Sequence, residues 1–284
     1  TGDFTCPNRD GTKSYNGCIY CNNDSFTPIT AIHKNSIKKQ IQDAIYHFKK
    51  RYKAKKFLAY FQSYTNTYAD ISYLRKVYYE ALSVKDVVGI AIGTRPDCVN
   101  DEVLDLLNEI GEKYHLWLEL GLQSIHNKSL EYINRCDTFE NFVKVYNKAR
   151  IRKNIHISTH LIHGLPTESV EDMLESTRIV ADMGIDGIKF HQLHIVKNTL
   201  MEKMYYEGKV KLPSLNEYLD ILGKSLLLLP KDIIIQRLFG LSNPDILVAP
   251  KWSIKKENLT KLVDDYLLDN EIYQGKSGYN TNNL

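Results

Sequence analysis

The chain has 284 residues, of which 43% are apolar and 25% are charged, and its formal net charge is +3. These proportions are typical of a globular protein, and the charge is too small to prove a nucleic-acid partner. The sequence has no apolar run of about 18 residues and no secretory signal, so we expect a cytoplasmic protein without a membrane segment. The length fits one large α/β domain, or one domain with a small appendage.

The first informative segment, Thr5–Asn22, contains three of the five cysteines. Cys6, Cys18 and Cys21 have the spacing C-x11-C-x2-C, with glycines between them that allow the loop to bend. A 4Fe–4S cubane normally takes four thiolates, so three would leave one iron with an open position. Structural zinc is the alternative, although no obvious fourth ligand appears before His33. The odd number of cysteines makes disulfides a poor explanation.

After this loop, apolar residues recur alternately at helical and at strand spacing. We expect a helix at Glu168–Met183 to begin at Thr167, which has the side chain of an N-cap. Alternation of strands and helices predicts a partial (β/α)6 barrel of the TIM type, with a first strand upstream of Cys6 and functional loops at the carboxyl ends of the strands. The other predicted helices are Asn35–Tyr52, Ser72–Leu82, Asp101–Glu112, Lys128–Asn134 and Glu140–Arg150; the predicted strands lie within 57–62, 87–99, 115–124, 155–166 and 186–199.

The character of the sequence changes beyond the barrel. We assign residues 1–211 to the barrel, with its first strand possibly truncated upstream, and residues 212–284 to a C-terminal α/β extension. An apolar helix is expected from Ser214 to Leu229 and another near Asn258–Leu268. Between them, Ile233–Leu238 is predicted to add a strand beside the barrel.

Small and polar residues on the predicted strands suggest a site inside the barrel. Gly89, Ala91 and Gly93 share one face of a strand, so we expect a ligand to lie against that face. Glu119 lies in an otherwise apolar strand and needs a partner, either in a structural ion pair or in a cofactor site. His160 belongs to a polar row that is predicted to face the interior, where it could contact a ligand or be a satisfied core residue.

Two segments are rich in cations. Six cations lie within Lys49–Lys56, and a second basic segment spans Lys251–Lys256. Such segments can contact phosphates, but a solvated helix end is an equally good explanation of the first.

Several motifs together resemble those of radical S-adenosylmethionine (radical SAM) enzymes. The chain is similar to the radical domain of the Elongator catalytic subunit in the motifs GTRPDC, ELGLQS, INR followed by CDT, and HLIHGLP. It is more closely similar to the bacterial YhcC/YtqA group of radical SAM proteins in CPNRDGT, HQLHIVKNT, QRLFG and APKW. The resemblance covers nearly the whole chain.

The resemblance implies a 4Fe–4S cluster on Cys6, Cys18 and Cys21. S-adenosylmethionine would chelate the open iron, and its reductive cleavage would generate a 5′-deoxyadenosyl radical. No catalytic residue is assigned, because the radical derives from the cofactor. The implied contacts to S-adenosylmethionine are Tyr20 near the adenine, Gln62 and Ser63 at the methionine amino group, Glu119, Gln123, Arg135 at the methionine carboxylate, and His160 and Ile162 at the ribose and adenine.

Some of these assignments compete with structural roles. Gln62 and Ser63 occupy a position where many relatives have a glycine-rich turn. An arginine suits a carboxylate, but Arg135 could also be a cation at the end of a helix. Glu119 would orient the cofactor or pair with Arg135. Cys98 and Cys136 match no cluster position and are interpreted as ordinary small side chains, since free cysteine is often buried.

The resemblance also implies a reaction on tRNA. Relatives modify C5 of wobble uridines, and the subgroup is associated with 5-methylaminomethyl-2-thiouridine synthesis, at the step from the carboxymethylaminomethyl to the aminomethyl group. The residues after the barrel are too few for the acetyltransferase domain of Elongator subunits. We expect tRNA as the partner and a reductant such as flavodoxin or ferredoxin, and the sequence leaves the oligomeric state open. The alternatives are a radical SAM enzyme acting on another substrate, such as a porphyrin precursor or a peptide, and a zinc-containing tRNA-binding module without redox chemistry.

Overall fold

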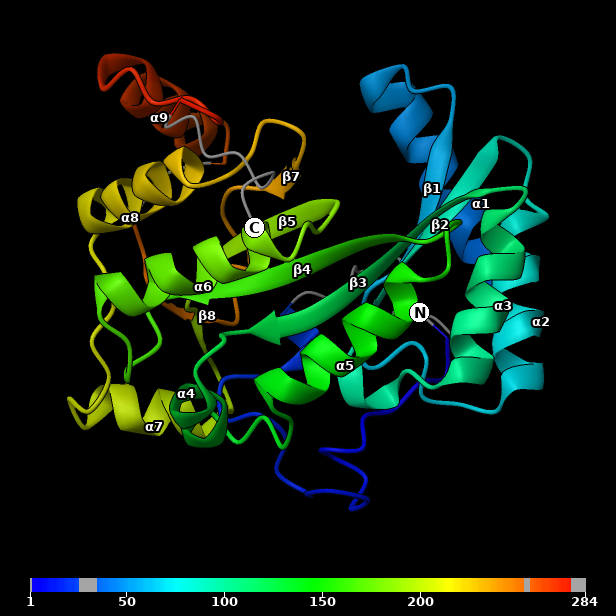
Figure 1. The fold of residues 1–284 in the computed structure, drawn as a ribbon, viewed down its shortest axis with the longest axis horizontal. Helices are drawn as coiled ribbons and strands as arrows, with labels where there is room; N and C mark the ends of the chain where they lie inside the picture. Colours follow the sequence, from blue (N-terminus) through cyan, green and yellow to red (C-terminus); the bar gives the residue numbers. More distant parts are fainter. Residues whose placement is uncertain (1, 26–34, 253–255, 277–284) are drawn as a thin grey trace. The chain divides into compact units, whose positions relative to one another are not determined.

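The computed structural model describes residues 2–25, 35–252 and 256–276 (Figure 1). The chain divides into two compact units that each combine several segments. Unit 1 consists of Thr1–Asn16, Phe26–Gly121 and Glu140–Ile157. Unit 2 consists of Gly17–Ser25, Leu122–Phe139 and Ser158–Leu284. The cysteine loop is therefore shared, with Cys6 in unit 1 and both Cys18 and Cys21 in unit 2.

The main sheet has six strands in the order β1-β2-β3-β4-β5-β7, and the described pairs are parallel. This confirms the predicted α/β fold with a partial barrel. The sixth described strand is the one predicted at Ile233–Leu238, which pairs with β5. Residues 2–5 form no strand, so the strand expected upstream of Cys6 stays a prediction for residues before Thr1.

Unit 1 contains the first three strands and the helices that connect them. Helix α2 packs on β2, while α1 and α3 lie beside α2 (Figure 1). In α3, the helical spacing of buried leucines predicts the observed packing, and Asn100 caps the helix by accepting a hydrogen bond from the Val103 N–H at 2.9 Å. The elements are α1 (Ile37–Tyr52), β1 (Phe57–Phe61), α2 (Ile71–Leu82), β2 (Val87–Thr94), the 3-10 helix η3 (Pro96–Cys98), α3 (Asp101–Gly111), β3 (His115–Gln123, ending in unit 2) and α5 (Phe139–Arg150, beginning in unit 2).

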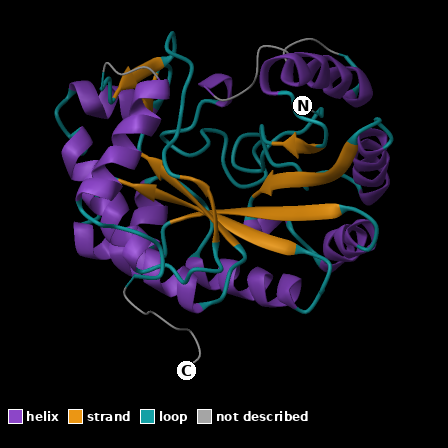
Figure 2. Cartoon of the chain, turned by 90° about the horizontal axis from the view of Figure 1, so that it is seen from above, coloured by secondary structure: helices purple, strands orange, loops and turns teal. Residues whose placement is uncertain are grey.

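Unit 2 contains the last three strands of the sheet and a smaller antiparallel pair, β6 with β8. Helix α8 packs between α6 and α9. In Figure 2 the helices lie outside the strands of their own unit. The elements are the 3-10 helix η1 (Asn23–Ser25), α4 (Asn127–Tyr132), β4 (His156–His163), α6 (Val170–Asp182), β5 (Gly187–Gln192), β6 (Ile195–Val196), α7 (Leu200–Tyr206), α8 (Leu215–Leu227), β7 (Ile234–Arg237), β8 (Leu247–Ala249) and α9 (Lys256–Asp269).

The predicted start of the helix after β4 is wrong. Helix α6 begins after Ser169, which forms a capping box with Asp172. The Thr167 hydroxyl instead lies 2.7 Å from the Ser129 hydroxyl. Ser169 can accept the same capping hydrogen bond as Thr167, and Asp172, three residues later, completes the capping box. This pair of residues sets the start of the helix.

No helix in the described part of the chain is long and apolar enough to cross a membrane.

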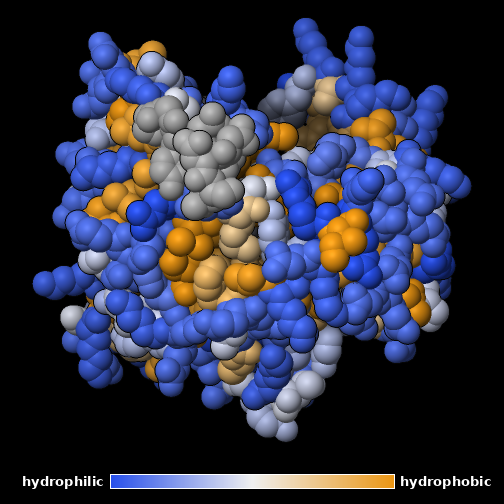
Figure 3. Space-filling view, in the orientation of Figure 1, coloured by the Kyte–Doolittle hydropathy of each residue, from blue (hydrophilic) through white to orange (hydrophobic). Residues whose placement is uncertain are grey.

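The surface seen in Figure 3 is mostly hydrophilic, with hydrophobic residues gathered in smaller groups. Several large apolar side chains of unit 1 are nevertheless exposed, notably Tyr46 at 69% and Tyr52 at 57% on α1. Leu58 and Tyr60 on β1 are also exposed. Tyr52 belongs to the last turn of α1 together with Lys49, Lys50 and Arg51, so exposed aromatic and basic side chains occur in the same turn.

Candidate functional site

Cys18 and Cys21 lie on one tight turn in unit 2. The Cys21 N–H donates to the Cys18 carbonyl at 2.9 Å, and Gly17 precedes the turn with a φ of +70°, a conformation that favours glycine. Cys18 is buried and Cys21 is half-buried. A C-x2-C turn of this kind can present two thiolates on one side of the backbone.

Backbone hydrogen bonds join this turn to segments far along the chain. The Ile19 N–H donates to the Ile133 carbonyl at 3.0 Å, and the Ile19 carbonyl accepts from the Met201 N–H at 3.0 Å. The Asn134 side-chain amide donates to the Gly17 carbonyl at 2.7 Å. The cysteine turn is therefore fixed at both faces by elements of unit 2 rather than held only by its own loop.

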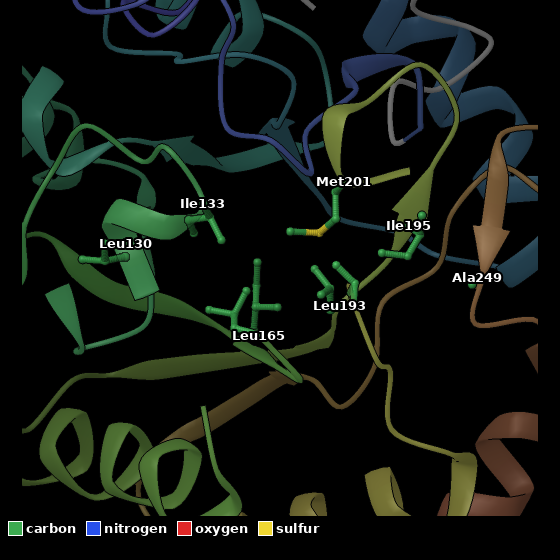
Figure 4. Close-up of a cluster of buried hydrophobic side chains, with 9 residues drawn as sticks. Leu130, Ile133, Leu165, Leu193, Ile195, Met201 and Ala249 are labelled. Carbon is green, nitrogen blue, oxygen red and sulfur yellow. The ribbon is translucent and has the colours of Figure 1, made fainter. Parts of the chain in front are cut away.

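An apolar cluster lies under the turn. Met201 and Ile133 point toward each other in the cluster, with side chains from four further elements around them (Figure 4). Ile19 and Tyr20, on the two sides of the turn's centre, pack against this cluster. Burial of that apolar surface anchors the turn. The buried members of the cluster are Leu130, Ile133, Ile162, Leu165, Leu193, Ile195, Met201, Val210 and Ala249.

Arg135 lies directly beside the cysteine turn. Its side chain is 7% exposed, and its Nη1 atom is 3.9 Å from the Sγ atom of Cys18. The Arg135 N–H donates to the Leu130 carbonyl at 2.8 Å. Asn134 and Cys136, on either side, both have a φ of +53°, so a tightly bent segment after α4 aims the arginine at the sulfur. The guanidinium can therefore donate a hydrogen bond to the Cys18 sulfur.

Cys6 belongs to the loop of unit 1. Its carbonyl accepts hydrogen bonds from the Arg9 N–H at 2.8 Å and the Asp10 N–H at 3.1 Å, while Thr5 accepts from the Thr65 N–H at 3.1 Å. The Cys6 side chain is half-buried. These bonds tie the loop to the segment that follows β1 and hold the cysteine in a fixed backbone turn.

Cys98 lies near Cys6 but has the chemistry of a buried thiol. Burial raises the pKa of Cys98 well above its ordinary value, and the negative charges of Asp97 and Cys6 act in the same direction. Arg95 binds Asp97 through two hydrogen bonds of 2.8 and 2.9 Å. The prediction that Cys98 is an ordinary small side chain agrees with this environment, whereas Cys136 is exposed and so is not explained by burial.

Of the other predicted contacts of unit 1, two follow β1 and one lies in the middle of β3. Gln62 is half-buried after β1, and Ser63 is 2% exposed. Glu119 is 3% exposed on β3, where it is paired in register with Gly93 of β2. Their roles toward S-adenosylmethionine stay predictions.

Asn66 is a residue of this region that sequence reasoning missed. Its side-chain amide donates to the carbonyl of Phe61 at 3.1 Å and to the carbonyl of Gly93 at 2.7 Å. The Tyr78 hydroxyl in turn donates to the Asn66 carbonyl at 2.5 Å. This asparagine joins the ends of β1 and β2, and the only signal for it was its place in the polar loop after a buried strand.

The remaining predicted contacts lie in unit 2. Gln123 ends β3 in a left-handed conformation, with a φ of +78°. Ile162 is 7% exposed and belongs to the apolar cluster under the cysteine turn. His160 is half-buried on β4 and is paired in register with Lys189 of β5. Unit 2 thus brings Tyr20 and Ile162 to one apolar cluster and places Arg135 at Cys18.

The cysteine turn of unit 2 fits a cluster site, because Cys18 and Cys21 share one turn and a cation lies at Cys18. A third thiolate from Cys6 of unit 1 stays a prediction. His33, the nearest sequence candidate for a fourth zinc ligand, lies outside the described residues. The described group of His126, Asp172 and Glu175 is a separate set of possible ligands that contains no cysteine.

Comparison with protein families finds two matching domains. The Radical SAM superfamily domain matches residues 11–180, and the Radical_SAM C-terminal domain matches residues 185–268. Among curated proteins, the chain is 37% identical to the uncharacterized protein YtqA of Bacillus subtilis over 97% of this chain and 85% of that protein. It is 39% identical to protein YhcC of Escherichia coli over 94% of this chain and 85% of that protein.

More distant similarities share the same fold. The chain is 25% identical to a tRNA uridine(34) acetyltransferase of Methanocaldococcus jannaschii over 63% of this chain and 32% of that protein. The structure of Elp3 from Methanocaldococcus infernus superimposes with a TM-score of 0.70 at 20% identity, covering 84% of this chain. This chain spans 60% of that Elp3 chain, less than two thirds of its length.

Proposed function

Because the chain belongs to the radical SAM superfamily, we propose that it modifies the C5 side chain of the wobble uridine in tRNA, converting a carboxymethylaminomethyl group to an aminomethyl group. It is a radical SAM enzyme, and its family uses a 4Fe–4S cluster and S-adenosylmethionine. Such enzymes need a reductant, for which flavodoxin or ferredoxin is proposed. The observation that carries the cofactor assignment is the contact between Arg135 and Cys18.

The cluster and S-adenosylmethionine supply a 5′-deoxyadenosyl radical when bound, and the protein positions them. Cys6, Cys18 and Cys21 are the proposed cluster ligands. The Arg135 guanidinium has five N–H donors, so contact with Cys18 is compatible with binding a carboxylate of the cofactor. Tyr20 and the apolar cluster beneath it offer a surface for the adenine. The proposal for Gln62, Ser63, Glu119, Gln123, His160 and Ile162 is that they complete the cofactor site.

Two observations support tRNA as the substrate. One is the similarity to a protein named tRNA uridine(34) acetyltransferase, although it covers only 63% of this chain. The other is the end of α1, where exposed cations and aromatic side chains lie together. Cations contact phosphates and aromatic rings stack on bases, so the combination suits RNA.

The basic end of α1 has identifiable members. We define the α1 basic surface as Lys50, Arg51, Lys53, Lys55 and Lys56, all of which are exposed. Lys49 is excluded because its Nζ atom lies 2.5 Å from the Asp86 carboxylate. The Arg51 guanidinium lies over the Tyr52 ring at 5.3 Å. The second basic segment, Lys251–Lys256, is only partly within the described residues.

The test of the proposed function is the nucleoside content of tRNA. A strain without this protein should accumulate the carboxymethylaminomethyl nucleoside and lose the aminomethyl products, as measured by mass spectrometry. Purified, anaerobically reconstituted protein with a reductant should convert that tRNA and release 5′-deoxyadenosine.

The rival functions predict different results. An unchanged tRNA profile together with 5′-deoxyadenosine release would favour a radical SAM enzyme with another substrate, such as a porphyrin precursor or a peptide. Stoichiometric zinc and no 5′-deoxyadenosine in anaerobically purified protein would favour the zinc-containing tRNA-binding module. Metal analysis and nucleoside analysis thus separate the three functions.

A further inference from the structure

A row of basic residues crosses three neighbouring strands of unit 2. The register of β4 and β5 pairs His160 with Lys189, and the register of β5 and β7 pairs Lys189 with Arg237. Residues paired in register on neighbouring strands project to the same face of a sheet. His160 and Lys189 therefore share one face, with His191 two residues further along β5, and an irregularity in the β5–β7 register between Ile188 and Lys189 brings Arg237 opposite Lys189. The charge of Arg237 reaches both His191 and His194, which places it beside these rings.

Arg237 differs from an ordinary paired arginine in its surroundings. It is half-buried, and within the described part of the chain it forms no ion pair with a carboxylate. Partly buried arginines usually have an anionic or hydrogen-bonding partner, because removing a charge from water is unfavourable. The arrangement leaves Arg237 with donors available to a ligand.

The neighbouring histidines do not add charge to the row. The His191 and His194 rings lie 4.8 Å apart. Burial lowers the pKa of His194 to about 4, and the charge of Arg237 acts in the same direction. Burial also lowers the pKa of His191, with His194 and Arg237 contributing. Both rings are neutral near pH 7, so they can offer hydrogen bonds while Arg237 carries the positive charge.

Hydrogen bonds hold the segment that follows Arg237 in place. The Gln192 side chain donates to the Gly240 carbonyl at 3.1 Å and accepts from the Gly240 N–H at 2.8 Å. The Tyr218 hydroxyl donates to the Leu238 carbonyl at 2.5 Å. A Cβ atom at Gly240 would lie 2.0 Å from the His191 ring, so glycine is required for this close approach. The site is thus ordered before any ligand binds.

We propose that Arg237, flanked by His191 and His194, binds an oxyanion of the substrate. Arginine binds carboxylate and phosphate groups through paired hydrogen bonds. If the proposed function is correct, the oxyanion is the carboxylate of the carboxymethylaminomethyl group. A phosphate of the same tRNA has the same chemistry and is the other possible source. The identity of the carboxylate rests on the proposed function, but the oxyanion site does not.

The test compares two pairs of ligands, and in each pair one member carries a negatively charged group that the other lacks. Binding of 5-carboxymethylaminomethyluridine, its methyl ester, uridine and uridine 5′-monophosphate is measured by calorimetry on the reconstituted holoenzyme. The variants are Arg237→Gln, Arg237→Lys and the control Arg178→Gln, which removes an exposed arginine of α6. A normal circular dichroism spectrum and cluster absorption establish that each variant is folded.

For a carboxylate site, the acid should bind the wild type roughly 10- to 100-fold more tightly than the ester, as expected for a charge-assisted pair. Arg237→Gln should abolish that preference, Arg237→Lys should restore part of it, and Arg178→Gln should leave it unchanged. Loss of the preference for uridine 5′-monophosphate over uridine in Arg237→Gln would support the oxyanion site with phosphate as its source.

The outcomes separate this inference from the proposed function. Should the wild type bind none of the nucleosides, the oxyanion site is judged by a phosphorus-31 NMR titration with inorganic phosphate, while the proposed function is judged separately by the nucleoside content of tRNA. Weaker phosphate binding in Arg237→Gln than in Arg178→Gln supports the site. Equal behaviour of Arg237→Gln and the wild type toward every anion overturns it.

Discussion

The Nη1 atom of Arg135 lies 3.9 Å from the Sγ atom of Cys18, although the two residues are separated by 117 positions in the sequence. The bent segment after α4 produces this proximity, together with the hydrogen bond that the Ile133 carbonyl accepts from Ile19 and the one that the Asn134 amide donates to Gly17. One N–H of the guanidinium faces the sulfur, and its other donors can hold a carboxylate.

Replacing Arg135 tests its place in the cofactor site. Arg135→Gln should weaken S-adenosylmethionine binding roughly 10- to 100-fold, because a hydrogen bond to a charged group contributes about 1.5–3 kcal/mol. Arg135→Lys should lose less, since it keeps the charge without the paired geometry. Binding is measured by equilibrium dialysis on iron-loaded protein. The matched control is Arg178→Gln. An unchanged affinity of Arg135→Gln for S-adenosylmethionine would show that Arg135 does not contact this cofactor.

Single cysteine replacements test the cluster ligands. Cys6→Ala, Cys18→Ala and Cys21→Ala should each lose most of the iron and the cluster absorption, because the cluster would have only two thiolates. Cys98→Ala and Cys136→Ala should retain both, and burial keeps the Cys98 thiol protonated by raising its pKa. The measurements are iron and sulfide content after anaerobic reconstitution. Iron loss in Cys98→Ala with a normal circular dichroism spectrum would require a different ligand set.

His163 should make the stability of the protein depend on pH. It is 1% exposed, its two ring nitrogens have no hydrogen-bond partner among the described residues, and burial lowers its pKa from 6.5 to about 4. The unfolded state therefore binds more protons below pH 6.5, so stability falls as the pH drops from about 6.5 toward 4. His163 alone should account for about 2 kcal/mol of loss between pH 7 and pH 5.

The variant His163→Phe removes this titration and should reduce the loss measured by urea denaturation at the two pH values. His194 titrates in the same direction and remains, so a smaller slope should persist. For each variant, the free energy of unfolding at pH 5 is subtracted from that at pH 7. A change in stability that is the same at both pH values therefore cancels. His47→Asn, which removes an exposed histidine of α1, is the control. An identical slope in His163→Phe and the wild type would contradict the prediction.

The hydrogen bonds between Gln192 and Gly240 can be tested by stability. Gln192→Ala would leave the buried N–H and carbonyl of Gly240 without their partner, and each unsatisfied group costs about 1–3 kcal/mol. We expect the free energy of unfolding to fall by about 2 kcal/mol or more. Gln42→Ala on the exposed side of α1 should change it by less than about 0.5 kcal/mol. A Gln192→Ala variant as stable as Gln42→Ala would show that water replaces the lost bonds.

Much of the fold could be predicted because local patterns decide it. The helices that pack on the sheet have strong periodicity, and β7 was predicted from the apolar run at Ile233–Leu238. Short elements were missed: α7 has seven residues, and β6 and β8 have two and three. Such segments carry too few residues to establish a period, and their pairing is set by distant contacts.

In the candidate site, too, the local patterns could be predicted, and the contacts between residues far apart in sequence could not. The C-x2-C spacing indicated thiolate ligands without any structure, because it is a local pattern. The contact of Arg135 with Cys18, and the joining of β1 and β2 by Asn66, depend on backbone conformation and on residues far apart in sequence. Arg237 was not singled out, since only the strand register shows that it lies opposite Lys189, which pairs with His160.

The hydrogen bonds of the cysteine turn also constrain the order of events during synthesis. Cys18 and Cys21 leave the ribosome early, but Ile19 is bonded to Ile133 and Met201. Until Met201 has been translated, the nascent chain lacks the platform that shapes this turn. Iron–sulfur assembly factors should therefore deliver the cluster only after Met201 has been synthesised, and a ribosome-stalled fragment ending before Met201 should not retain it.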